Sequence, residues 1–314
     1  MERPAIAQAP LLSRWIYALK PASWPKLAMP AFLGIALGVA ETHQLSGTSA
    51  LLATLFTVFD LIYVVTLNDW GDQEVDAIKR AMFPAGCSPK TIPDGILPAQ
   101  HLLVAGSLAG VLMLAVAILG EQLLGREHLL LWAGVAAALF AAYTLPPFAL
   151  NYRGGGELLE MIGVGVVLPL LTARFMGAEG FGPATRAVIP GLALLAMSSA
   201  LASGLSDEES DLAGGKRTFT TRLGNPRVRA LCLSMLIAGG GAILTATIAG
   251  ERWMRLLALI PLALYGWRAH QASGAAITNA FAAQGRLKKE LHFAIWGSSL
   301  ALSGALLWEG LLYA

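Results

Sequence analysis

Two acidic motifs, far apart in the chain, contain the residues best suited to chemistry. The first contains Asn68, Asp72 and Asp76, and the second contains Asp207 and Asp211. Residues four apart lie on one face of a helix, so each motif presents a stripe of oxygen ligands. Mg²⁺ prefers oxygen ligands and binds through one or two carboxylates together with substrate phosphates. The two stripes therefore predict a site for a diphosphate bridged by Mg²⁺.

Basic residues follow both motifs, and they are suited to phosphate oxygens that a metal leaves uncovered. The predicted diphosphate contacts are Lys20, Lys79, Arg80, Lys90, Arg153, Lys216 and Arg217. Asp207 follows Asp72 by 135 positions, and Asp211 follows Asp76 by the same number. This spacing indicates a duplicated four-helix unit with one additional span.

The composition places these motifs in a membrane protein. Of the 314 residues, 56% are hydrophobic and 13% charged, and the mean hydropathy is +0.62. Soluble domains carry about 25% charged residues. A chain this apolar needs lipid as its solvent. The net charge of +2 is too small for a nucleic-acid footprint, and no obligate protein partner is indicated.

A spanning helix needs about 20 mostly apolar residues. The chain has nine such segments, which predict one all-α domain over residues 1–314: 24–40, 49–68, 100–119, 128–145, 157–176, 187–206, 228–249, 253–270 and 291–312. Their long, continuous apolar runs argue against a membrane β-barrel, whose strands alternate.

Lys and Arg are retained in cytoplasmic loops. With the N-terminus in the cytoplasm, nine spans place 17 of the 22 Lys and Arg residues on the cytoplasmic side. We therefore predict a multi-pass membrane protein whose residues 1–20 are a cytoplasmic lead-in. Loops 69–99 and 207–227 are predicted to cap the active site on that side.

The motifs resemble those of the UbiA superfamily of intramembrane prenyltransferases. Residues 68–76 match its NDxxDxxxD signature, and residues 207–211 match its DxxxD signature, followed by a similar GKRTxxxRLG continuation to Gly224. Tyr143-Thr-Leu-Pro-Pro147 resembles a YxxPP motif, and residues 152–157 resemble the YRGxGE of the menaquinone branch. In the loop that follows the first motif, residues 82–95, Lys90 is the only basic residue, unlike in many relatives.

The resemblance implies a nine-helix bundle around a central cavity, with a polar mouth and an apolar tunnel. It implies Mg²⁺-dependent transfer of a prenyl group from an isoprenyl diphosphate to an aromatic or quinone-precursor acceptor. The metal ligands that it implies are Asn68, Asp72, Asp76, Asp207 and Asp211.

Two further residues are candidates for the reaction itself. Asp60 lies in the middle of the second predicted span, where ionisable residues usually face a cavity. It is either a residue that contacts the acceptor or takes its proton, or a protonated or hydrogen-bonded packing residue. Tyr143 is either a ring that stabilises an allylic cation or a residue of ordinary packing or interfacial anchoring.

Two other functions remain open at this point. A membrane terpene cyclase would ionise the same diphosphate but close the cation on itself without an acceptor. A transporter would also show repeats and charges within the membrane. The aspartates lie at one membrane face, where a water-soluble head group would bind, and this favours the enzyme.

Overall fold

The computed structural model describes residues 6–312, and every regular element in that range is helical. The long elements are α3 (Pro25–Thr42), α4 (Gly47–Gly71), α6 (Ala99–Leu124), α7 (Leu129–Thr144), α11 (Pro183–Ser206), α14 (Asn225–Ala249), α15 (Leu259–Ser273) and α16 (Phe281–Leu312). Shorter helices are α2 (Leu11–Leu19), α5 (Gln73–Met82), α8 (Leu150–Arg153), α12 (Glu208–Ala213) and α13 (Phe219–Leu223), with 3₁₀ turns η1 (Pro21–Ser23) and η3 (Trp253–Ala258).

The helices form the predicted membrane bundle. Six helical segments in the described range are long and apolar enough to cross a bilayer, and a seventh is added if the bent pair Leu11–Ser23 and Pro25–Thr42 is one span. α7 and α15 are shorter, with 16 and 15 residues. The number of nine spans therefore remains a prediction, whereas the all-helical membrane fold is confirmed.

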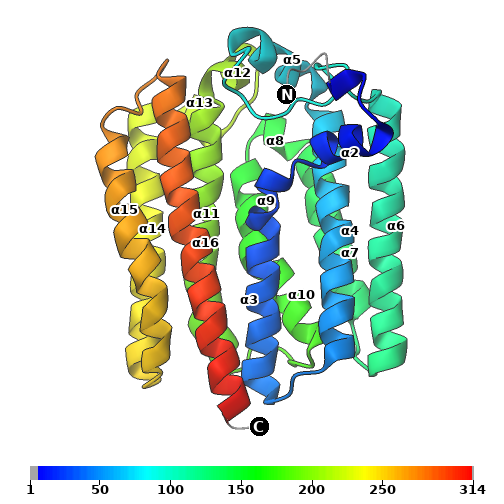
Figure 1. Cartoon of the computed structure of the whole chain (residues 1–314). Helices are drawn as coiled ribbons and strands as arrows, with labels where there is room; N and C mark the ends of the chain where they lie inside the picture. Colours follow the sequence, from blue (N-terminus) through cyan, green and yellow to red (C-terminus); the bar gives the residue numbers. More distant parts are fainter. Residues whose placement is uncertain (1–5, 313–314) are drawn as a thin grey trace.

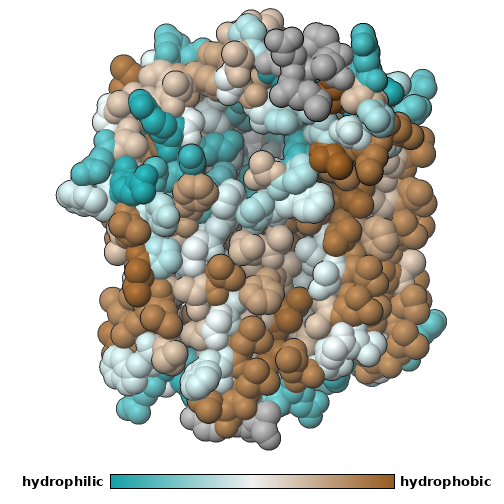
Figure 2. Space-filling view, viewed as in Figure 1, coloured by the Kyte–Doolittle hydropathy of each residue, from teal (hydrophilic) through white to brown (hydrophobic). Residues whose placement is uncertain are grey.

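The short helices gather at one end of the bundle, where α2, α5, α12 and α13 lie, and α16 ends at the opposite end (Figure 1). Hydrophobic residues cover much of the sides of the bundle, and hydrophilic residues gather at both ends (Figure 2). Apolar side chains such as those of Val104, Val111 and Ile237 are more than 60% exposed. Such a surface is stable only in contact with lipid.

The helices pack closely where glycine removes the side chain. A Cβ on Gly34 of α3 would lie 2.0 Å from Thr172 Oγ1 and 2.2 Å from the Pro169 carbonyl oxygen. Gly191 of α11 and Gly239 of α14 face each other, and a Cβ on either would lie 2.9 Å from the other's carbonyl oxygen. Small residues allow this close approach of helices in lipid.

The segment predicted as the fifth span is irregular. It consists of α9 (Gly156–Ile162), the π-helical turn η2 (Gly163–Val167) and α10 (Leu168–Phe175). π-Helical turns inside α-helices frequently occur at functional sites. Here the turn lies in the wall of the central cavity described below.

Candidate active site

Both acidic motifs lie where a long helix ends. α4 ends at Gly71 and α11 at Ser206, and the next residues have φ/ψ of −97°/10° at Asp72 and −113°/2° at Asp207. These angles lie in the sparsely populated bridge region, outside a regular helix. α5 and α12 follow at once, at the same end of the bundle (Figure 1). Each carboxylate stripe therefore bends at its first aspartate.

The lysine that follows each motif pairs with an aspartate of the other motif. Lys79, which follows the first motif, forms an ion pair with Asp207 of the second and donates to the Ser206 carbonyl oxygen at 3.2 Å. Lys216, which follows the second motif, lies with Nζ 2.9 Å from Asp72 Oδ1 of the first. The two segments that the equal spacing suggested to be duplicates thus contact each other through two matching ion pairs.

Two more carboxylates of the first motif have ammonium partners. Asp76 pairs with Lys90, and Asp69 pairs with Lys20 and accepts a hydrogen bond of 2.7 Å from Thr91 Oγ1. Asp69 lines the cavity, but Asp76 does not. Asp76 instead lies against Lys90, which does line the cavity, and its place among the metal ligands stays a prediction.

The charges of the second motif are strongly coupled. Burial acts to raise the pKa of Asp207, but the ammonium groups of Lys79 and Lys288 outweigh it and hold that pKa well below its ordinary value. Burial and the neighbouring Asp207 charge raise the pKa of Asp211 to about 8. The two neighbouring carboxyl groups thus have pKa values shifted in opposite directions, down for Asp207 and up for Asp211.

A central cavity of about 330 Å³ opens between the motifs. Its charged mouth is lined by Lys20, Lys26, Asn68, Asp69, Asp72, Lys90, Asn151, Asp207, Asp211, Lys216 and Lys288. Its deeper part is mostly apolar and includes Leu27, Val64, Leu139, Phe140, Val164 and Leu168. A ligand with an anionic head and an apolar tail fits this distribution.

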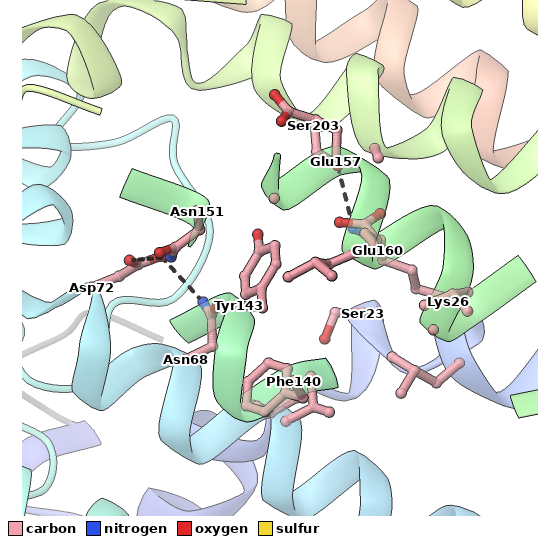
Figure 3. A pocket seen from close by; sticks show the side chains of 18 of the residues that line it. Ser23, Lys26, Asn68, Asp72, Phe140, Tyr143, Asn151, Glu157, Glu160 and Ser203 are labelled. Carbon is pink, nitrogen blue, oxygen red and sulfur yellow. Dashed lines mark hydrogen bonds and ion pairs between the residues drawn. The ribbon is translucent and has the colours of Figure 1, made fainter. Parts of the chain in front are cut away.

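The mouth offers oxygen ligands for Mg²⁺ that come from both motifs. Asn68 Nδ2 lies 3.5 Å from Asp72 Oδ2, and Asn151 Nδ2 donates to Asp72 Oδ1 at 3.1 Å (Figure 3). The other amide atom, Asn151 Oδ1, is buried without a hydrogen-bond partner in the structure. This unsatisfied acceptor, next to the Asp72 carboxylate, fits a site for a cation.

Protein side chains alone do not complete such a metal site. Within residues 6–312, no three His, Cys, Asp or Glu residues lie close enough together to hold a metal ion. Mg²⁺ keeps several waters and binds readily through one or two carboxylates plus phosphate oxygens. The donor set therefore fits a metal that arrives with a phosphorylated ligand, with Asn68, Asp72, Asp207 and Asp211 at hand.

The predicted phosphate contacts separate into two groups. Lys20, Lys90 and Lys216 line the cavity, and Lys79 lies beside it against Asp207. Three arginines do not line the cavity: Arg80, Arg153 and Arg217.

Arg80 makes its contacts outside the cavity. It donates from Nε and Nη2 to Asp94 at 2.7 Å each, and Nη1 lies 2.9 Å from Cys87 Sγ. Tyr17 also donates to Asp94 at 2.6 Å. The Arg80 guanidinium is thus used to hold the loop after α5, which leaves Lys90 to face the cavity. Arg153 and Arg217 are exposed.

Sequence reasoning missed several residues of the mouth. Lys26 pairs with Glu160 at 2.8 Å, and Lys288 donates to Ser206 Oγ at 3.1 Å. Behind these lining residues, Tyr152 does not line the cavity, but its ring centroid lies 4.6 Å from Lys216 Nζ and its hydroxyl donates to the Gly71 carbonyl oxygen at 3.3 Å. Lys26 and Lys288 occur near span ends, where charged residues are normally interfacial, so their sequence positions gave no sign of this role.

The two reaction candidates both line the cavity. Tyr143 is the penultimate residue of α7, and its side chain lies between the Asp72–Asn151 pair and Glu160 (Figure 3). Its ring stacks on that of Phe140 with centroids 6.0 Å apart. Asp60 is buried in α4 and faces the deeper part of the cavity.

The model of the UbiA prenyltransferase family matches residues 27–281, which is most of the chain. The chain belongs to the UbiA prenyltransferase family. It is therefore a prenyltransferase enzyme, and the resemblance seen in the sequence motifs is confirmed.

Relatives of this UbiA family member include two lycopene elongase/hydratases. A lycopene elongase/hydratase from Halobacterium salinarum is 25% identical over 266 residues, covering 83% of this chain and 88% of that protein. A lycopene elongase/hydratase from Haloferax volcanii is 26% identical over 250 residues, covering 79% of this chain and 76% of that protein.

Solved structures share the fold. A UbiA homolog from Archaeoglobus fulgidus bound to GPP and Mg²⁺ has a TM-score of 0.68 at 16% identity, covering 92% of this chain and 99% of that one. At this level of identity the likeness concerns the fold alone, and it confirms the UbiA-type bundle.

Proposed function

We propose that this enzyme transfers an isoprenyl group from an allylic diphosphate to the alkene end of an apolar acceptor, with Mg²⁺ as the cofactor. The observation that carries the proposal is the convergence of both acidic motifs on one cavity that is charged at its mouth and apolar at depth. The solved homolog bound to GPP and Mg²⁺ supports the donor and the metal.

In the proposed reaction, the bond between the allylic carbon and the diphosphate oxygen breaks, and its electron pair leaves with the diphosphate. When bound, Mg²⁺ neutralises the charge that grows on that leaving group. Asn68, Asp72 and Asp207 would hold the metal, and Lys20, Lys90 and Lys216 would bind the phosphate oxygens. These preorganised charges stabilise the transition state.

The apolar wall has the second role. The side chains of Val64, Phe140 and Leu168 line the deeper cavity. They exclude water from the allylic cation, which would otherwise be captured as an alcohol. The faces of Phe140 and Tyr143 lie in the same wall and are suited to stabilise a cation. The acceptor double bond then supplies the electron pair for the new carbon–carbon bond.

The class of acceptor is the finer part of the proposal. The lycopene elongase/hydratase relatives favour a polyene, and the apolar depth of the cavity agrees with a hydrocarbon. The aromatic or quinone-precursor acceptor expected from the sequence stays a prediction, and a role in quinone biosynthesis has no support from these relatives. A cyclase needs no acceptor, so omitting the acceptor distinguishes it.

We also propose that residues 1–20 and the capping loops 69–99 and 207–227 face the cytoplasm. The concentration of Lys and Arg on that side supports this orientation. Single cysteines replacing Glu74 and Glu127 in a Cys87→Ser background would test it. An impermeant maleimide should label the Glu74 position only in inside-out vesicles, and labelling there from outside intact cells would refute the orientation.

The activity test uses the full chain in lipid nanodiscs with labelled dimethylallyl or geranyl diphosphate. Release of diphosphate and product masses are followed with a polyene, with a phenolic acceptor and with none. Release should require Mg²⁺ and fall by at least 100-fold in Asp72→Asn and Asp207→Asn. Glu74→Gln is the matched control, because Glu74 is an exposed acid of the first motif that does not line the cavity. Undiminished release in both aspartate variants would refute the proposed function.

A further inference from the structure

One carboxyl group in the cavity, that of Asp60, lies well below the charged mouth. Asp60 lies eight residues before Asn68 in α4, which places it about 12 Å deeper along the helix axis. No described residue of α4 before Asp60 lines the cavity. Asp60 is only 6% exposed, and within residues 6–312 its side chain has no hydrogen bond or ion pair. Burying an unpartnered carboxyl group is costly, and ionisable residues inside a membrane usually serve a pathway or a reaction.

The position of Asp60 on α4 aims it at the ligand space. Asp60, Val64 and Asn68 follow one another at four-residue spacing, and all three line the cavity. This is one face of the helix. The face thus runs from a metal-binding amide at the mouth, past an apolar residue, to a carboxyl group at depth.

The acids on the opposite wall are already engaged. Glu157 accepts a hydrogen bond of 2.7 Å from the Phe219 backbone N–H. Glu160 pairs with Lys26 at 2.8 Å. Tyr63, one turn from Asp60, donates to the Ala137 carbonyl oxygen at 3.0 Å and is not available to pair with it. Among the described acids that line the cavity below the mouth, Asp60 is therefore the one without a hydrogen bond or ion pair.

The proposed chemistry requires a base at that depth. A head group at the level of Asn68 puts the allylic carbon below it, and the acceptor double bond approaches that carbon within about 3.5 Å. The carbon that loses a proton is next to the new cationic carbon, and its base must lie within about 3 Å. The length of the diphosphate and these two separations together are comparable to the roughly 12 Å between the levels of Asn68 and Asp60.

We propose that Asp60 is the base that completes the transfer by taking a proton from the acceptor. The acceptor π electrons form the new carbon–carbon bond, which leaves a cation on the neighbouring acceptor carbon. The Asp60 carboxylate removes a proton from a carbon adjacent to that cation, and the C–H electron pair becomes the new double bond. The proton stays on Asp60 until the product leaves. The inference rests on the proposed function and assigns its last step.

The test measures two quantities in the same reaction: diphosphate released and coupled product formed. Full-length enzyme in nanodiscs is given geranyl diphosphate, Mg²⁺ and a linear polyene. The variants are Asp60→Asn, Asp60→Glu, Asp72→Asn and Thr57→Val. Thr57 is the matched control, because it is buried in the same helix, does not line the cavity and bonds only to its own helix at the Ala53 carbonyl oxygen.

Asp60→Asn should release diphosphate within a few-fold of the native rate but form coupled alkene about 100-fold more slowly, since a general base contributes roughly 10²–10⁴-fold. The remaining flux should appear as prenyl alcohol or hydroxylated acceptor. Asp60→Glu should recover part of the coupling, and Thr57→Val should behave as native.

Two results would overturn the assignment. Asp60→Asn could couple as efficiently as the native enzyme, or it could lose diphosphate release together with coupling, as Asp72→Asn is expected to do. The second result would make Asp60 a structural or ionisation residue. Failure of the proposed function itself would appear elsewhere, as native diphosphate release in Asp72→Asn, so the two failures are distinguishable.

Discussion

Replacing Gly163 with Phe should shorten the cavity and change which donor the enzyme accepts. Gly163 begins the π-helical turn η2 and lines the cavity, and a Cβ built on it would have no neighbour within 4 Å. A benzene ring fits a cavity of about 150 Å³. The new ring would thus remove nearly half of the 330 Å³ available.

The size of the effect follows from the tail of the donor. Geranyl diphosphate carries five more carbons than dimethylallyl diphosphate, and burial of each is worth about 0.8 kcal/mol. Complete exclusion of those carbons would cost about 4 kcal/mol, and a third of that is already a tenfold change. We expect kcat/KM for the geranyl donor to fall at least 10-fold more than that for the dimethylallyl donor.

The assay is competition between the two labelled donors in one vessel, with diphosphate release measured for each. Gly134→Phe is the control, since Gly134 also has open space at its Cβ but does not line the cavity. An equal loss for both donors, or the same selectivity change in Gly134→Phe, would refute the reasoning that the cavity at η2 holds the tail.

Three further predictions follow from the ion pairs and the packing. Lys216→Met should leave the Asp72 carboxylate without its ammonium partner, and removing one partner of a buried pair costs about 3–5 kcal/mol of stability. Diphosphate release should drop at least 100-fold in Lys216→Met, whereas Lys216→Arg should keep part of it. Native activity in Lys216→Met would contradict the assignment. Arg80→Ala and Asp94→Ala should each lower the melting temperature, and the double variant should be less destabilised than the sum of the singles because the two residues form one pair; strict additivity would show that the pair contributes nothing. Gly34→Val should abolish the folded bundle, as judged by size-exclusion chromatography, because its side chain would overlap α10, and a monodisperse, active variant would disprove that close approach.

The sequence predicted the class of fold well because membrane burial leaves a strong local signal. Residues 49–68 and 187–206 were expected as spans, and the helices are Gly47–Gly71 and Pro183–Ser206. The break inside residues 157–176 was not expected, because the π-helical turn at Gly163 changes no residue's hydropathy. The same limit explains why 253–270 was expected as one span although its first turn is 3₁₀.

The site was only partly predictable, since spacing along a chain reports the helix face but not where a helix ends. The four-residue spacing held, with backbone hydrogen bonds of 2.8 Å from Asp76 to Asp72 and from Asp211 to Asp207. The helical angles are interrupted at Asp72, and Asp76 beyond that point pairs with Lys90. The sequence likewise could not show that Arg80 forms an ion pair with Asp94, because the two side chains meet only after the intervening loop has folded.

The reciprocal ion pairs, Lys79 with Asp207 and Lys216 with Asp72, have a consequence for how the ligand binds. Because acids and ammonium groups already neutralise one another at the mouth, a bare diphosphate would meet carboxylates and a bare Mg²⁺ would meet lysines. When a preformed magnesium–diphosphate complex binds, the carboxylates can bind its metal and the lysines its phosphate oxygens at the same time. The local charge then changes little. Neither component should therefore bind tightly without the other, and occupancy should follow the concentration of the complex.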